Sequence, residues 1–88
     1  MEIGFVYIIK SLKSDTYYIG SSKDPEKRLI EHNNGKTVST KHKGPWKLVL
    51  TQSYPTILKA RQIELKLKKL KRRDYIEKIV EEKIIKIK

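Results

Sequence analysis

Cysteine is absent from this chain of 88 residues, so packing alone must hold its fold together. Secreted domains of this size often depend on disulfides, and small zinc folds usually depend on thiolate ligands. A chain this short has room for one domain with one modest core. The sequence therefore predicts a single domain and favours a cytoplasmic location.

Charge is the second constraint on the chain. Lys and Arg number 21 against 10 Asp and Glu, which gives a formal net charge of +11 and a pI near 9.9. A nucleic acid is the usual partner of such a domain, because each neutralised phosphate releases counterions. Solubility is the competing explanation. Charge alone separates neither DNA from RNA nor binding from cleavage.

The apolar residues are too dispersed for a membrane protein. Hydrophobic residues make up 38% of the chain and charged residues 35%. No apolar run approaches the ~20 residues that a membrane-spanning helix needs. Residues 1–4 show neither the basic start nor the apolar stretch of a secretory signal. We therefore expect neither a membrane span nor a signal peptide.

Two short apolar runs near the N-terminus predict a β-hairpin. Residues 5–9 are β-branched and aromatic without alternation, which is typical of a strand buried on both faces. Ser14 and Asp15 supply turn chemistry, and residues 16–20 resemble a second strand. Because the connection is short, we expect the two strands to be antiparallel.

The hairpin is followed by signals for a helix. Asp24 is a suitable N-cap and Pro25 suits the first helical position. The helix is expected over residues 25–33, with an exit at the following Asn-Gly pair. Residues 36–44 then form a polar, basic loop.

The second half of the chain predicts one strand and two helices. Apolar and polar residues alternate over residues 46–53 except at Val49, which favours a third strand. Residues 55–70 form the longest helical segment. Asp74 is a plausible N-cap for a short final helix, and we expect a frayed, basic C-terminus within residues 71–88.

Four residues on these elements could carry chemistry. Arg28 and His32 are four residues apart on the first helix and therefore share a face, while the apolar positions 29 and 30 are expected to face a core. Tyr7 and Tyr18 lie on the two hairpin strands. A solvated polar face is the alternative for the helix pair. Core packing with satisfied hydroxyls is the alternative for the tyrosines.

Glu64 is more informative, because it interrupts an apolar stripe on the long helix. At about 100° per residue, the stripe contains Ile57, Ala60, Ile63, Leu67 and Leu70. Glu64 falls inside this stripe, where an acid is costly unless it is paired or binds a metal. A metal or catalytic role and a salt bridge with a nearby Lys or Arg both remain open.

Taken in order, these residues resemble the pattern of the GIY-YIG endonuclease family. The match consists of Val6-Tyr7, then Tyr18-Ile19-Gly20, then Arg28, His32 and Glu64. The intervening stretch resembles the small stand-alone members through His32-Asn33, Gly35, Ser39-Thr40-Lys41 and Pro45-Trp46. The resemblance covers about residues 4–72.

The resemblance implies a fold and a division of the chain. The expected class is α+β, with a small, mainly antiparallel three-stranded sheet flanked by helices. Residues 1–72 would form the nuclease domain, and residues 73–88 a C-terminal helical extension of the same domain.

The sequence departs from the family pattern in three ways. The first triplet is Phe5-Val6-Tyr7, so its leading Gly and Ile are replaced. Some members carry a lysine directly after the second motif's glycine, where this chain has Ser21, although Lys23 is close. We find no appended DNA-binding domain in these 88 residues, so little sequence specificity is expected.

The resemblance also implies roles in metal-dependent hydrolysis of DNA. Glu64 would hold one Mg²⁺ or Mn²⁺ ion, for which a carboxylate is a suitable ligand. Arg28 would brace the scissile phosphate, because its planar fork matches phosphate oxygens. Tyr7 or Tyr18 would take a proton from water, which requires a pKa depressed by Arg28 below the usual ~10. His32 could be an alternative base or a hydrogen-bonding partner.

Basic residues are candidate contacts for the flanking phosphates of a nucleic acid. These residues are Lys23, Lys36, Lys41, Lys43, Lys66 and Lys69. A solvated helix face is the alternative for the downstream members. We expect an endonuclease that is structure-selective or single-strand-selective and acts in DNA repair or recombination. The alternative is a non-catalytic nucleic-acid-binding module or an accessory subunit of a repair complex.

Overall fold

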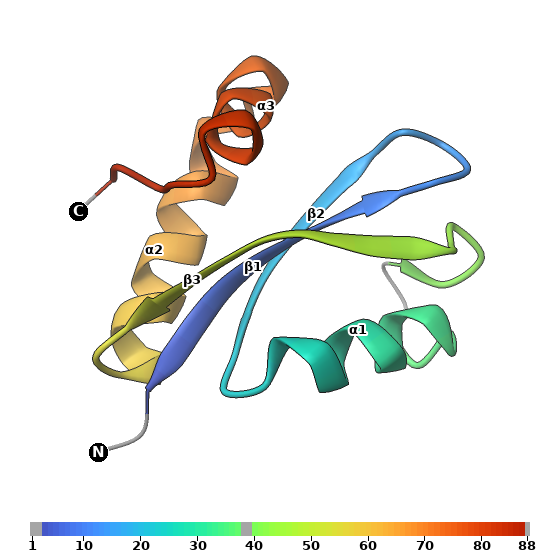
Figure 1. Ribbon diagram of the computed structural model, residues 1–88, viewed down its shortest axis with the longest axis horizontal. Coiled ribbons are helices and arrows are strands. Elements are labelled where there is room, and N and C mark those ends of the chain that lie inside the picture. The colour runs from blue at the N-terminus through green and yellow to red at the C-terminus, as the bar shows by residue number, and fades with distance from the viewer. Residues whose placement is uncertain (1–2, 38–39, 88) are drawn as a thin grey trace.

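The computed structural model of the chain describes residues 3–37 and 40–87. Met1, Glu2, Ser39 and Lys88, which entered the sequence analysis, lie outside these ranges. The strands are β1 (Gly4–Ser11), β2 (Tyr17–Ser22) and β3 (Trp46–Tyr54), and the helices are α1 (Pro25–Asn33), α2 (Ile57–Leu70) and α3 (Arg73–Glu82). The strands form one antiparallel sheet in the order β2-β1-β3. Figure 1 shows α1 on one side of the sheet and α2 and α3 on the other, so the expected α+β class is confirmed.

The central strand β1 is buried on both faces, as its unbroken apolar run predicts. Side chains alternate between the two faces of a strand. Val6 and Ile8 pack against α2 and α3, whereas Tyr7 and Ile9 pack on the side of α1. None of the four is more than 1% exposed. One strand therefore supplies both cores and places Tyr7 beneath α1.

A β-bulge in β3 explains the irregular alternation at Val49. Ile8 pairs with Leu50 and Ile9 pairs with Leu48, so Val49 has no partner on β1. A bulge of this kind inserts one extra residue into one strand of a pair. Leu48 consequently packs on the α1 side of the sheet, while Val49 and Leu50 pack on the α2 side.

Helix α1 starts as its capping signals predict. The Asp24 side chain accepts a hydrogen bond from the Lys27 backbone N–H at 3.1 Å, and Pro25 occupies the first turn. Leu29 packs against the sheet, but Ile30 is 61% exposed. The expectation that both face a core is wrong, because neighbouring positions on a helix point about 100° apart.

Helix α3 starts differently from the prediction. Lys71 adopts a left-handed conformation and ends α2, and Arg72 follows in an extended conformation as the N-cap of α3. Asp74 is therefore not the N-cap. It lies in the first turn, where its carboxylate accepts from Arg72 at 2.7 Å and still favours the positive end of the helix dipole.

The chain after α3 is packed rather than frayed through residue 87. Ile85 is 4% exposed and belongs to the core shared with α2. The Gln52 side-chain amide donates to the Ile85 carbonyl at 3.0 Å and accepts from the Ile85 N–H at 2.7 Å. The expectation of a frayed end is wrong for these residues. The Gln52 side-chain amide on β3 forms with the Ile85 backbone the hydrogen bonds that a neighbouring strand would otherwise supply.

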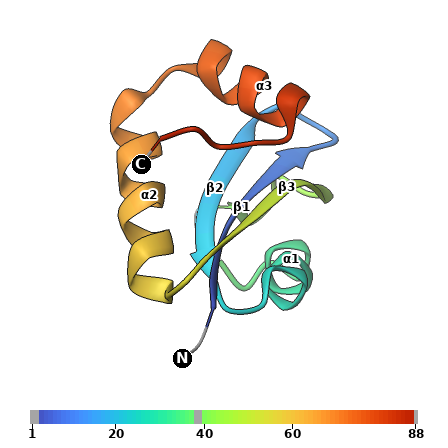
Figure 2. The same cartoon turned by 60° about the vertical axis from the view of Figure 1, so that its left-hand side comes forward.

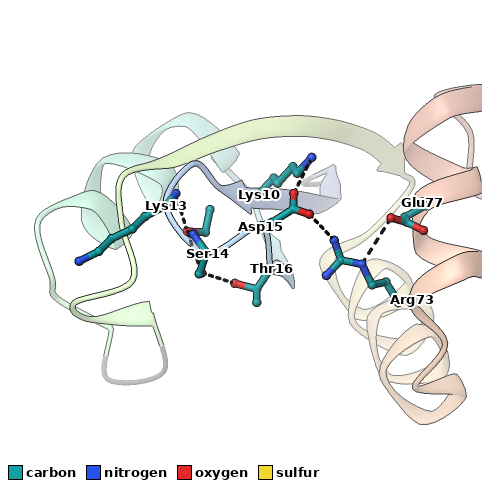
Figure 3. Close-up of polar contacts among 8 residues, drawn as sticks. Lys10, Lys13, Ser14, Asp15, Thr16, Arg73 and Glu77 are labelled. Atoms are coloured by element: carbon teal, nitrogen blue, oxygen red, sulfur yellow. Dashed lines mark hydrogen bonds and ion pairs between the residues drawn. The ribbon is translucent and has the colours of Figure 1, made fainter.

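A set of ion pairs joins the turn of the hairpin to the start of α3 (Figure 3). Arg73 donates to Asp15 at 2.9 Å and to Glu77 at 3.4 Å, and Lys10 lies 2.9 Å from the other oxygen of Asp15. Each pair is well exposed, so each contributes little to stability. The pairs link the start of α3 to the hairpin turn.

Replacement of Ile85 should test the packing of the C-terminal segment. We expect Ile85→Ala to lower the free energy of unfolding by about 2 kcal/mol or more, because it leaves a cavity in the α2 core. Its neighbour Ile84 is 45% exposed, so Ile84→Ala should cost about 0.5 kcal/mol or less. Urea unfolding measures both values, and equal losses would contradict the packing of Ile85.

Candidate active site

The first contact of the site joins β1 to α1. The Tyr7 hydroxyl lies 2.9 Å from Nε2 of His32, which is itself 1% exposed. Gly20, the glycine of the second motif, pairs with Tyr7 across the hairpin. A Cβ atom at Gly20 would overlap the Tyr7 ring and hydroxyl. Only glycine therefore leaves room for Tyr7 to reach His32.

The second contact fixes the proton positions on His32. Nδ1 of His32 lies 2.8 Å from the Thr40 hydroxyl, which in turn donates to the Thr37 carbonyl at 3.4 Å. The Thr40 oxygen is then the acceptor for Nδ1–H, so Nε2 is unprotonated and accepts from Tyr7. Burial lowers the pKa of His32, and the nearby Arg28 lowers it further. His32 is therefore neutral at pH 7.

Tyr7 is also neutral at pH 7. Burial raises the pKa of Tyr7, and the Arg28 guanidinium beside it only partly offsets this. The depressed pKa expected of a tyrosine base is therefore not found at Tyr7, because burial outweighs the arginine. Arg28 is held by Glu31, whose carboxylate lies 2.6 Å from the guanidinium.

Tyr18 lies between the two halves of the site. Its ring centroid is 4.8 Å from that of His32, and the Lys68 ammonium lies 5.4 Å from the Tyr18 ring centroid. Tyr18 belongs to β2, which forms the edge of the sheet next to α2 (Figure 2). The edge of β2 thus connects the α1 residues with the residues of α2.

Glu64 faces this edge from α2. Its side chain is 12% exposed, and both of its oxygens are engaged. Oε1 accepts a hydrogen bond from the Ser21 hydroxyl, and Oε2 lies 2.6 Å from the Lys68 ammonium. The salt bridge that the sequence left open is therefore present. Ser21 stands where some members of the resembled family carry lysine.

The structure brings the five candidate catalytic residues together around the edge strand β2. Tyr7, Tyr18 and His32 are in contact, and Arg28 lies beside Tyr7. Glu64 is close enough to raise the pKa of Tyr7 through its charge. Four supporting residues were not anticipated in these roles, namely Ser21, Glu31, Thr40 and Lys68. Glu31 and Lys68 follow their partners by three and four residues, which is a readable helical pairing signal.

The candidate phosphate-binding lysines are spread more widely. Lys36, Lys41 and Lys43 are exposed on the loop after α1. Lys41 lines a hollow of about 710 Å³ together with His32, His42 and Lys13, the last of which comes from the hairpin turn. The loop cations therefore lie near the α1 half of the site, and Lys13 joins them.

The remaining three lysines are not gathered around Glu64. Lys23 is exposed and lines a smaller hollow of about 280 Å³ at the start of α1. Lys66 and Lys69 are exposed on α2. At about 100° per residue they leave the helix on sides other than that of Glu64. Lys68 is the lysine of α2 that reaches the site.

The donors around Glu64 can be tested against a divalent cation. Within residues 3–37 and 40–87, no group of three or more His, Cys, Asp and Glu side chains could hold a metal by itself. Glu64 and the Ser21 hydroxyl supply hard oxygen atoms of the kind that Mg²⁺ and Mn²⁺ prefer. These two residues fit an ion that takes its remaining ligands from water and phosphate.

A family model described as the GIY-YIG catalytic domain matches residues 3–79. The chain belongs to the GIY-YIG family. A UPF0213 protein of Staphylococcus saprophyticus is 35% identical over 82 residues, which cover 92% of this chain and 99% of that protein. The solution NMR structure of a UPF0213 protein from Bacillus halodurans is 29% identical, with a TM-score of 0.57, over 92% of this chain and 86% of that one.

Another relative of this GIY-YIG domain is named for its activity. The structure-specific endonuclease subunit SLX1 of Candida dubliniensis is 42% identical over 67 residues, which cover 67% of this chain but only 23% of the relative. The family and this relative support a nuclease role for the chain.

In the part of the chain that the structure describes, no helix is long and apolar enough to cross a membrane.

Acidification should destabilise this GIY-YIG domain through His32. The pKa of His32 is lowered below 6.5 in the folded chain, so the unfolded chain binds the proton more readily. Stability should then fall as the pH drops below about 6.5, by at most about 1.4 kcal/mol per pH unit. Urea unfolding between about pH 7 and about pH 5.5 measures this loss.

A variant that cannot titrate at this position provides the control. His32→Gln should reduce the dependence of stability on pH over the same interval. An NMR titration of the His32 ring in the wild-type protein gives a direct second measurement. A midpoint at or above 6.5 would contradict the buried, neutral imidazole.

Proposed function

We propose that this protein is a divalent-metal-dependent endonuclease that hydrolyses phosphodiester bonds in DNA with little sequence specificity. The proposal depends on the convergence of Arg28, the Tyr7–His32 pair and Glu64 at the edge of β2. Hydrolysis needs an acceptor for the proton of water and positive charge near the phosphoryl oxygens. The cluster holds a group suited to each need.

Arg28 is the residue that we assign to the scissile phosphate. Its guanidinium has five N–H donors, and Glu31 engages the NH1 nitrogen at 2.6 Å. The side chain is 36% exposed, so the other donors can form paired hydrogen bonds with phosphate oxygens. Glu31 keeps the arginine in place, which lowers the entropy cost of positioning the phosphate.

Tyr7 and His32 are the residues that we assign to proton transfer. The Tyr7 hydroxyl takes a proton from the attacking water as it gives its own proton to Nε2 of His32. The neutral imidazole and the 2.9 Å contact support this order of transfer. Tyr7 is 1% exposed, so the attacking water reaches the hydroxyl only when the side chains that cover it move. We assign Tyr18 to packing against His32.

Glu64 and Ser21 are the residues that would hold Mg²⁺ or Mn²⁺. When bound, such an ion supplies positive charge to the phosphate and lowers the pKa of its bound water. Ser21 orients the carboxylate by donating to Oε1. Because the chain offers one carboxylate here, the ion should bind well only when a phosphate provides further oxygen ligands.

The substrate is the least specified part of the proposal. The net charge of +11 and the lysines of the loop after α1 favour DNA, with contacts to its backbone. The relatives named as structure-specific endonuclease subunits favour recognition of nucleic-acid structure over sequence. Within this proposal the substrate is branched or single-stranded DNA, and the role is in repair or recombination. The absence of cysteine favours a cytoplasmic location.

A second function is favoured by the word subunit in the names of those relatives. The chain could then be a non-catalytic nucleic-acid-binding module or an accessory subunit of a repair complex. DNA binding that survives chelation, without cleavage of single-stranded, duplex or branched DNA, would favour this second function.

Loss of the carboxylate should abolish cleavage. We expect Glu64→Gln and Arg28→Ala each to lower the rate of cleavage of labelled branched, single-stranded or duplex DNA by about 100-fold or more, because each removes charge stabilisation of the transition state. Chelation with EDTA should have the same effect on the wild-type protein. Cleavage is measured from the labelled products with Mg²⁺ or Mn²⁺ present.

Glu81→Gln is the matched control for this experiment. Glu81 is an exposed acid on α3, away from the edge of β2, and the substitution makes the same change of charge. Its cleavage rate should equal that of the wild type. Undiminished cleavage by Glu64→Gln would mean that the active site lies elsewhere or that another nuclease contaminates the sample.

The loop cations should determine the salt dependence of DNA binding. Log affinity falls as log salt concentration rises. Replacing Lys41 and Lys43 by Ala should make this fall less steep, by about 0.9 in the slope for each lost contact with duplex DNA. Replacing Lys78 and Lys86, exposed on and after α3, removes the same charge and should leave the slope close to wild type. Fluorescence anisotropy at several salt concentrations measures the slopes. Equal slopes in the two variants would remove the loop from the binding surface.

A further inference from the structure

The Lys68 ammonium contacts the carboxylate oxygen of Glu64 that the Ser21 hydroxyl does not contact. The Lys68 ammonium lies 2.6 Å from Oε2, and the Ser21 hydroxyl donates to Oε1. Each oxygen of the carboxylate therefore already has one partner from the chain itself. A divalent cation that binds Glu64 at Oε2 must share or take the position next to the Lys68 ammonium.

The two partners differ in how easily they can leave. Ser21 is a short side chain on β2, so its hydroxyl is confined near Glu64. Lys68 carries its charge on a flexible four-carbon stem, and its side chain is 43% exposed. An ammonium and a divalent cation also repel each other. Lys68 is therefore the partner that must move.

A hollow next to β2 offers the Lys68 ammonium a second position. In its present position beside Glu64 the ammonium also lies 5.4 Å from the Tyr18 ring centroid, so the ring face attracts it there. The Lys68 side chain lines this hollow, which has a volume of about 290 Å³. Lys71 and Arg72 line the same hollow. Lys68 thus stands between the carboxylate and a surface where the phosphates of a bound strand could attract it.

We propose that Lys68 competes with the divalent cation for Glu64 and leaves the carboxylate when the phosphate of a bound strand attracts its ammonium. The inference rests on the proposed function, because it assumes that Glu64 holds the metal. Lys68 thereby regulates the site, because it keeps the affinity of Glu64 for the metal low until nucleic acid binds. Because coupling is reciprocal, nucleic acid and metal strengthen each other's binding.

Lys68→Met separates this role from a structural one. Methionine keeps an unbranched side chain against Tyr18 and removes the charge. We expect the Mg²⁺ affinity of the protein without DNA to rise on the order of twofold to fivefold, as for loss of a partly exposed ion pair. Lys68→Arg keeps a cation next to Glu64 and should retain the wild-type affinity. A purely structural role would weaken Mg²⁺ binding or leave it unchanged in Lys68→Met.

NMR titration with Mg²⁺ measures the affinity, with the backbone amide signals of Ser21 and Glu64 as reporters. Lys78→Met is the matched control, because it removes the same charge from an exposed lysine of α3 that takes no part in the proposed site. Its Mg²⁺ affinity should stay close to wild type, since distant exposed charges are largely screened. Retained dispersion of the amide spectrum verifies that each variant is folded.

The outcomes separate the inference from the proposed function. Equal Mg²⁺ affinity in folded Lys68→Met and wild type, with binding lost in Glu64→Gln, would overturn the role of Lys68 and leave the metal site intact. Mg²⁺ binding that is unaffected by Glu64→Gln would overturn both. Tighter binding in Lys68→Met, with wild-type affinity in Lys68→Arg and Lys78→Met, supports the competition.

Discussion

Burial of β1 on both faces is the constraint on which the rest of this structure depends. Alternating side chains of one strand hold α2 and α3 on one side and α1 on the other. Tyr7 is part of this strand, so the hydroxyl that contacts His32 is fixed by the same packing that forms the core. Gly20 on the neighbouring strand supplies the space for its ring. The Tyr7–His32 half of the site is therefore positioned by the packing of the sheet.

The two halves of the site differ in electrostatic character. On the α1 side, Tyr7, His32 and Thr40 form a buried chain of neutral groups, which suits the movement of a proton. On the α2 side, Glu64 and Lys68 form an ion pair that suits the exchange of cations. Tyr18, on the edge strand β2, lies between Lys68 and His32. A further positive charge next to His32 would lower the affinity of the imidazole for a proton.

Local patterns predicted the elements and the ordered motif, whereas contacts between distant segments were not readable. Periodicity and capping predict the strands and helices α1 and α2. The family resemblance predicts the convergence of Tyr7 with Glu64. The pairing of Ser21 with Glu64 spans 43 residues, and that of Gln52 with Ile85 spans 33. Neither pair leaves a mark on the local sequence. The misplaced cap at Asp74 has a local cause, since the backbone turn at Lys71 shifted the start of α3.

Ser21 shows how a departure from the family pattern is compensated by another element. Some members of the family carry a lysine directly after the second motif's glycine, and a cation on that strand would be tied to the sheet. In this chain Ser21 keeps only a hydrogen bond to Glu64, and the ammonium beside the carboxylate comes from Lys68, on α2. A positive charge on a helix side chain, 43% exposed, can withdraw without disturbing the sheet. The positive charge beside Glu64 therefore lies on a side chain that, under the competition proposed above, can respond to a bound phosphate.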